Sequence, residues 1–131
     1  MNEKQSLKKM INIYFKSIEA DDISSLKNLI HRDALFFSMG NHNRYCSHSK
    51  NEIVKNINVL KSFPKNSESQ ENNITLQSID NILISDAVGF ADIKWLYLTF
   101  SDHETHRGSI HFVKTNHRWK IYSFIDRGIV V

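Results

Sequence analysis

The chain has 131 residues, which fits one domain over residues 1–131, and 40% of them are hydrophobic, enough for a packed core. Its 17 Lys and Arg residues against 14 Asp and Glu give a net charge of only +3. The charges are scattered and form no run of five or six, so the basic stripe of a nucleic-acid-binding protein is absent.

Cysteine content and hydropathy indicate the cellular compartment in which we expect the protein. Cys46 is the single cysteine, so an internal disulfide framework is excluded and a reducing compartment is favoured. The N-terminus lacks the apolar segment of a signal peptide, and no stretch approaches the roughly 18 apolar residues of a membrane helix. We therefore expect a cytoplasmic protein that binds neither membrane nor nucleic acid.

The N-terminal part of the chain predicts two helices. Residues 6–20 carry apolar side chains at three- and four-residue spacing, which places them on one helix face: Leu7, Met10, Ile11, Tyr14, Phe15 and Ile18. Asp21 and Asp22 end this helix and offer an N-cap to a second helix over residues 23–30. A turn at residues 31–33 is expected to follow.

A strand, a loop and a third helix come next. Residues 34–39 predict the strand, and residues 40–44 predict a polar loop. Ser49, with Glu52 three positions later, forms a capping box and opens a helix that Pro64 stops. A polar linker then leads to the second half of the chain.

The second half of the chain predicts four strands, at residues 74–85, 88–100, 105–114 and 119–126. Short turns separate them, so consecutive strands are expected to pair antiparallel. A sheet formed mostly after the helices can curl around them and leave a closed-ended pocket. The expected class is therefore α+β, with a curved, mainly antiparallel, barrel-like sheet around three helices of the N-terminal half.

Several short motifs occur along the chain in an order that is typical of a known fold. They are Tyr14-Phe15, Ala20-Asp21-Asp22, Arg32-Asp33-Ala34, Asp86-Ala87-Val88, Ile110-His111-Phe112-Val113-Lys114 and Trp119-Lys120-Ile121. With this order of elements, nearly the whole chain resembles the nuclear transport factor 2-like (NTF2-like) superfamily, in particular its SnoaL-like and ketosteroid-isomerase-like branch. The resemblance implies a cystatin-like fold, a conical pocket and a homodimer. It implies no single function, because this fold hosts several enzymes and also non-enzymatic modules.

The resemblance also suggests where to look for catalytic residues. Ketosteroid isomerases combine an Asp base with a Tyr and a protonated Asp that donate to an enolate oxygen. Aligned through Tyr14 and Asp33, the chain places Tyr14 at the tyrosine position, Ser38 at the base position and Ile110 at the second acid. Serine without an activator is no base and isoleucine donates nothing, so steroid isomerisation is not expected.

Strand alternation adds His106 to the candidate catalytic residues. It falls on the same strand face as Ile110 and Phe112, which we assign to the pocket, and histidine titrates near neutral pH. The competing interpretations are an exposed hairpin histidine and, for Tyr14, a tyrosine at the edge of the core. The predicted ligand-binding residues are Phe36, Trp95, Tyr97, Ile110, Phe112 and Trp119, which can equally be core residues.

The remaining polar candidates are weaker. Asp92 and Lys94 alternate with apolar residues and are expected to point away from the helices, unless a β-bulge reverses them into the pocket beside Asp126-Arg127. His42 and His48 are expected to be solvated. No spacing of His, Cys and carboxylates matches a familiar metal site, and no cofactor is expected.

Two functions remain open. The first is a homodimeric small-molecule-binding protein with an apolar pocket, or an isomerase, cyclase or hydratase in which His106 moves a proton and Tyr14 polarises an oxygen. The second is a non-catalytic homodimerisation or protein-interaction module, whose sheet presents His111, Tyr122 and Phe124 to a partner.

Overall fold

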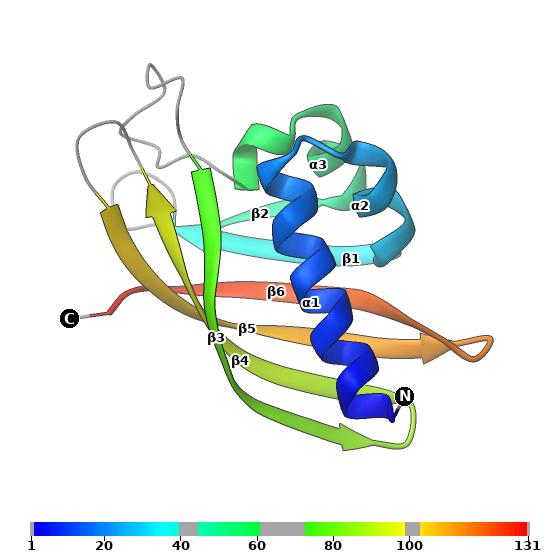
Figure 1. The fold of residues 1–131 in the computed structure, drawn as a ribbon. Coiled ribbons are helices and arrows are strands. Elements are labelled where there is room, and N and C mark those ends of the chain that lie inside the picture. Colours follow the sequence, from blue (N-terminus) through cyan, green and yellow to red (C-terminus); the bar gives the residue numbers. More distant parts are fainter. Residues whose placement is uncertain (1, 40–44, 61–72, 99–102, 131) are drawn as a thin grey trace.

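The computed structural model describes residues 2–39, 45–60, 73–98 and 103–130. Over these residues it has the expected α+β class, and Figure 1 shows the order of its elements. They are α1 (Glu3–Glu19), α2 (Ile23–Leu29), β1 (Ile30–Met39), β2 (Tyr45–Ser49), α3 (Lys50–Lys55), the 3-10 helix η2 (Ile57–Leu60), β3 (Asn73–Ser85), β4 (Val88–Leu98), β5 (His103–Thr115) and β6 (Arg118–Ile129).

The strands form one curved, open sheet in the order β2-β1-β6-β5-β4-β3. Neighbouring strands are antiparallel, as expected, except that β1 and β6 run parallel. Helix α1 lies across one face of the sheet, and α2 and α3 lie beside β1 and β2 (Figure 1). We call the face under α1 the inner face and the opposite face the outer face.

Apolar packing holds α1 on the inner face. Its buried side chains recur at helical spacing, and the first of them, Leu7 and Ile11, are fully buried. Each such burial contributes about 1.5–3 kcal/mol. The capping box between Asn2 and Gln5 starts the helix three residues before the predicted start, and a cap contributes only about 1 kcal/mol. Packing on the sheet therefore stabilises α1 more than its cap does.

The region around β1 differs most from the sequence-based prediction. Residues 31–33 are strand rather than turn, because β1 begins at Ile30, which pairs with Ile121 of β6. Strand β2 was not predicted at all. Its residues are mostly polar, and only pairing with the end of β1, Leu35 to Met39, makes them a strand.

The third helix is shorter than predicted. The capping box of Ser49 and Glu52 is confirmed, but the α-helix ends at Lys55. Asn56 leaves helical geometry, and its side-chain oxygen accepts from the backbone N–H of Asn58, a local bond that competes with helix continuation. The predicted stop at Pro64 and the predicted loop at 40–44 lie outside the described residues.

The two hairpin turns that lie within the described residues follow the prediction. Asp86, between β3 and β4, has a positive φ of 52°. Asn116 and His117, between β5 and β6, have φ values of 51° and 64°. Two successive residues in the left-handed region are typical of a type I′ hairpin turn, whose twist matches that of the flanking strands.

Two register shifts between β5 and β6 decide which way the last strand's side chains point. In the first, His111 pairs with Ser123 and Phe112 with Ile121, so Tyr122 is an extra residue in β6. Alternation restarts there, and Phe124 turns to the inner face with 6% exposure. The predicted presentation of Phe124 on the outer face is therefore wrong, whereas Tyr122 does lie on that face.

The first shift also places Asp126 on the inner face, two residues after Phe124, and a second shift follows it. His106 pairs with Ile129 and Gly108 with Asp126, so β6 again carries one extra residue, near Gly128, whose φ is +97°. Gly108 makes room on the opposite strand, since a Cβ there would lie 2.2 Å from the Ile125 carbonyl oxygen. Strand β6 thus places the Asp126 carboxylate on the inner face.

Candidate functional site

A small cavity on the inner face brings together the polar side chains of Tyr14, Ser38, His48, Tyr97 and Asp126. Residues from α1, β1, β2, η2, β3, β4 and β6 line it: Tyr14, Phe36, Phe37, Ser38, His48, Val59, Leu60, Ile74, Tyr97, Phe124 and Asp126. Its volume is about 20 Å³. A cavity of that size holds about one water molecule, so a whole ligand does not fit inside it.

A buried histidine–carboxylate pair forms one wall. His106 and Asp126 are 3% and 4% exposed, and His106 Nδ1 lies 2.9 Å from Asp126 Oδ1 and 3.1 Å from Oδ2. The backbone N–H of Gly128 also donates to Asp126 Oδ1, at 2.8 Å. An ionised carboxylate only accepts, so with Asp126 ionised His106 carries its proton on Nδ1.

The second nitrogen of His106 faces another acid. Its Nε2 lies 3.8 Å from Glu104 Oε2, and the ring of Tyr97 packs edge-on against the imidazole at 4.7 Å. His106 is therefore placed between two carboxylates and behind Asp126, which itself lines the cavity. The alternative of an exposed hairpin histidine is wrong.

Two tyrosines line the same cavity. Tyr14 packs against Phe15, Phe36 and Phe124 with ring centroids 5.1–6.0 Å apart. Burial raises the pKa of Tyr14 well above its usual value, and Tyr97 and Asp126 raise it further. Burial, then Asp126, also raises the pKa of Tyr97. Both phenols are thus neutral hydrogen-bond donors at physiological pH.

Ser38 and His48 form a second polar pair at the cavity. Because His48 lies opposite Phe36 in the β1–β2 register, it shares the inner face with Ser38. Ser38 Oγ lies 3.3 Å from His48 Nε2, and His48 Nδ1 lies 3.6 Å from Glu52 Oε2. The side chain of His48 is only 17% exposed, so its expected solvation is wrong. Because β2 was not predicted, sequence reasoning did not find the contact between Ser38 and His48.

The predicted site residues are divided among three places. Tyr14, Phe36, Ser38 and Tyr97 line the cavity, and His106 lies behind it. Trp95, Ile110 and Phe112 belong to the buried core. Trp119 is half-buried near the β5–β6 turn, with Lys114 Nζ 5.4 Å from its ring centroid.

Asp92 and Lys94 point outward, as expected, because Ala91, Ile93, Trp95 and Tyr97 occupy the inner face of β4. Arg127 Nη2 binds Asp92 Oδ1 at 2.7 Å. Asp126 and Arg127 therefore lie on opposite faces, and no bulge brings Asp92 to the cavity.

The described residues offer neither a metal site nor a membrane-spanning helix. Within residues 2–39, 45–60, 73–98 and 103–130, no group of three or more His, Cys, Asp and Glu residues could hold a metal ion. Cys46 is exposed, and His42 lies outside those ranges. No helix in the described part of the chain is both long and apolar enough to cross a membrane.

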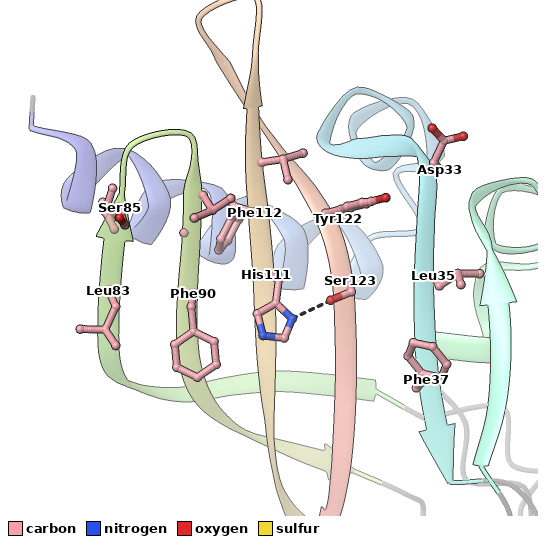
Figure 2. Close-up of a pocket in the computed structure, with 14 residues that line it drawn as sticks. Asp33, Leu35, Phe37, Leu83, Ser85, Phe90, His111, Phe112, Tyr122 and Ser123 are labelled. Atoms are coloured by element: carbon pink, nitrogen blue, oxygen red, sulfur yellow. Dashed lines mark hydrogen bonds between the residues drawn. The ribbon is translucent and has the colours of Figure 1, made fainter.

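The outer face carries a larger, open and mostly apolar groove of about 590 Å³ (Figure 2). Strands β1, β6, β5, β4 and β3 supply its lining, and the helices lie behind the sheet in this view. Leu35, Leu83, Val88 and Tyr122 are exposed there, Leu83 by 60%. In the middle, His111 Nδ1 lies 2.6 Å from Ser123 Oγ.

The buried tyrosines predict a specific alkaline response. A folded-state pKa raised above the unfolded value gives stability that is complete below about pH 10 and is lost as pH rises toward the folded pKa. The free energy of unfolding should therefore fall above pH 10, and fall less steeply in Tyr14→Phe. Urea titrations between pH 8 and 11 measure this, with phenolate absorbance as a second signal. Identical slopes in both proteins would contradict the burial of the Tyr14 hydroxyl.

Comparison with known proteins places the fold. No protein family model and no curated protein sequence matches the chain. Among solved structures, an uncharacterized cystatin-like-fold protein from Caulobacter vibrioides superposes with a TM-score of 0.74 at 15% identity, covering 98% of this chain and 89% of the other. An NTF2-like protein from Cytophaga hutchinsonii gives 0.69 at 16% identity, with coverages of 96% and 98%.

A third structure, an NTF2-like superfamily protein from Salmonella enterica, has a TM-score of 0.71 at 19% identity and covers 98% of this chain and 92% of that one. These identities are too low to transfer a function, but the superpositions span almost the full length of both chains. The resemblance seen in the sequence is thus confirmed at the level of architecture: the chain has the cystatin-like fold of NTF2-like proteins.

Proposed function

We propose that this protein binds a small molecule at the inner cavity and transfers a proton on it, as a cytoplasmic member of the SnoaL-like group with isomerase-, cyclase- or hydratase-type chemistry. The observation that carries the proposal is the position of Asp126. Its carboxylate is 4% exposed, is held by His106 and lines a cavity that also receives the Tyr14 side chain.

The cost of this arrangement supports a functional role. Removing a carboxylate and an imidazole from water costs several kcal/mol per ion if both are charged, and a well-packed apolar pair of similar volume is often at least as stable. The surrounding core is apolar and aromatic, so such a replacement would fit there. A buried acid–base pair beside a cavity is the pattern of a proton-transfer site.

Each group can be given a role. Asp126 faces the cavity and accepts the proton, and His106 orients the carboxylate through Nδ1. Tyr14 stays neutral and donates a hydrogen bond to the substrate oxygen on which charge develops. The cavity admits only the reacting end of the molecule, so we expect a substrate with a terminal carbonyl or hydroxyl group.

A second candidate function is self-association through the outer groove. Its lining crosses five strands and includes the exposed apolar side chains of Leu35, Leu83, Val88 and Tyr122, and exposed apolar surface of this kind marks interaction sites on proteins. The occupant we propose is a second copy of this chain, in a homodimer. The two functions are compatible, since the groove and the cavity lie on opposite faces of the sheet.

The first function predicts selective binding of small oxygen-bearing fragments. In ligand-observed NMR with a panel of small phenols and ketones, the wild type should bind members of the panel. Tyr14→Phe should weaken binding about 2- to 10-fold, the value of one hydrogen bond. Asp92→Asn is the matched control, because it removes an outer-face carboxylate and should not change binding. Equal binding by wild type and Tyr14→Phe, or none by either, would count against the site.

The second function predicts a dimer that depends on the outer groove. Leu83→Lys places a charge at the most exposed apolar position of the groove and should shift sedimentation from dimer to monomer. Ile23→Lys, at an exposed apolar residue of α2 outside the groove, is the control and should remain dimeric. A wild type that sediments as a monomer at micromolar concentration would refute this function.

A further inference from the structure

We propose that Ser38 is a nucleophile activated by His48 and positioned through Glu52, and that the cavity accepts the acyl group of a short-chain ester. The inference rests on the proposed function, because it assigns a reaction to the same cavity. It goes further by naming a covalent step, a substrate class and two residues that the proton-transfer proposal does not use.

The geometry follows the order that acyl transfer requires. Ser38 Oγ lies 3.3 Å from His48 Nε2, and the other ring nitrogen, Nδ1, lies 3.6 Å from Glu52 Oε2. A hydroxyl, an imidazole and a carboxylate thus stand in sequence, with the base between nucleophile and acid. Distances of this kind tighten when a substrate binds.

Each of the three side chains of the proposed triad lies on a regular secondary-structure element. Ser38 is on β1 and His48 on β2, on one face of an antiparallel pair. Glu52 is in the first turn of α3, where its carboxylate also accepts from the backbone N–H of Ser49 at 3.3 Å. The capping box therefore aims the carboxylate as well as starting the helix.

The cavity supplies the two other requirements of acyl transfer, a hydrogen-bond donor for the oxyanion and space for the substrate. Ser38 and His48 both line it, and so does Tyr14, which can donate to the oxyanion of a tetrahedral intermediate because burial keeps it neutral. The volume of about 20 Å³ admits only the carbonyl end of an ester, with the alcohol part and any longer chain outside. A short-chain ester fits these limits.

The reaction balances with water as the only co-reactant. Ser38 Oγ attacks the carbonyl carbon while its proton passes to His48 Nε2. The bond to the alcohol oxygen breaks, and His48 returns the proton to the departing alcohol. Water then attacks the acyl-serine and gives a proton to His48, and the bond to Ser38 breaks. Ser38 recovers its proton and a carboxylic acid is released.

The sheet offers an internal control. On the outer face, Ser123 Oγ lies even closer to a histidine, 2.6 Å from His111 Nδ1, but His111 contacts the ring of Phe90 and lies in the open groove rather than in the cavity. A serine–histidine contact alone would favour Ser123. The proposal, which requires the acid and the cavity, favours Ser38.

The test uses p-nitrophenyl acetate with the full-length protein. We expect a burst of nitrophenolate and an acetyl group on Ser38, located by peptide mass spectrometry. Ser38→Ala should abolish both, and His48→Gln should slow acylation by roughly 10²–10⁴-fold. Ser123→Ala should behave as wild type. Ser38→Thr, which keeps the hydroxyl, checks the result if the alanine variant unfolds.

Glu52 is tested as a positioning residue. Glu52→Gln keeps the capping box but removes the charge, so it should keep the denaturation midpoint. Without this carboxylate the imidazole loses the group that orients it, so the acylation rate constant should fall while the KM for the ester stays unchanged. Ser49→Ala is the structural control, which should lower the midpoint without changing the acylation rate constant.

The outcomes separate this inference from the proposed function. Acetylation of Ser123, or an unchanged rate in Ser38→Ala or His48→Gln, would overturn the nucleophile while fragment binding at Tyr14 remains intact. A wild type that is not acetylated but still binds the fragments would also overturn Ser38 as the nucleophile. Loss of fragment binding together with absent acetylation would instead refute the cavity as a site.

Discussion

The hydrogen bond between His106 and Asp126 is the interaction on which the inner face depends. A carboxylate buried among aromatic side chains is tolerated only with good partners, and Asp126 has two, the His106 imidazole and the backbone N–H of Gly128. The register shift at Tyr122 turns the carboxylate inward, and Gly108, opposite Asp126, leaves space for the strand to approach. Without His106, the buried Asp126 carboxylate would keep only the backbone N–H of Gly128 as a partner.

The same strand gives the two faces of the sheet different characters. The bulge at Tyr122 sends Phe124 into the core, where it stacks on Phe36 at 5.8 Å, and keeps Tyr122 in the outer groove. The inner face thus combines an aromatic core with one polar cavity, while the outer face is a broad apolar surface. A small-molecule site and a subunit interface can therefore coexist on opposite faces of one sheet, with Phe37 lining both.

Much of the architecture could be predicted from the sequence, because helical periodicity, capping boxes and left-handed turn residues are local signals. The remaining features depend on strand pairing between segments far apart in the sequence, which leaves no local signal. Polar β2 becomes a strand only against β1, and so His48 was expected in solvent although it contacts Ser38. Bulges leave no periodic trace, so the burial of Phe124 and Asp126 could not be read from strand alternation. His106 and Tyr14 were found because they lie on regular segments.

The protonation state of His106 is the most direct test of the buried pair. Long-range ¹H–¹⁵N correlation NMR of the imidazole, assigned with His106→Gln, distinguishes which ring nitrogen carries the proton. We expect Nδ1 to be protonated near neutral pH, with a hydrogen-bonded resonance that disappears or shifts in Asp126→Asn and is unchanged in Asp92→Asn. A His106 that is protonated only on Nε2, or that does not respond to Asp126→Asn, would contradict the buried pair and the proton-transfer site built on it.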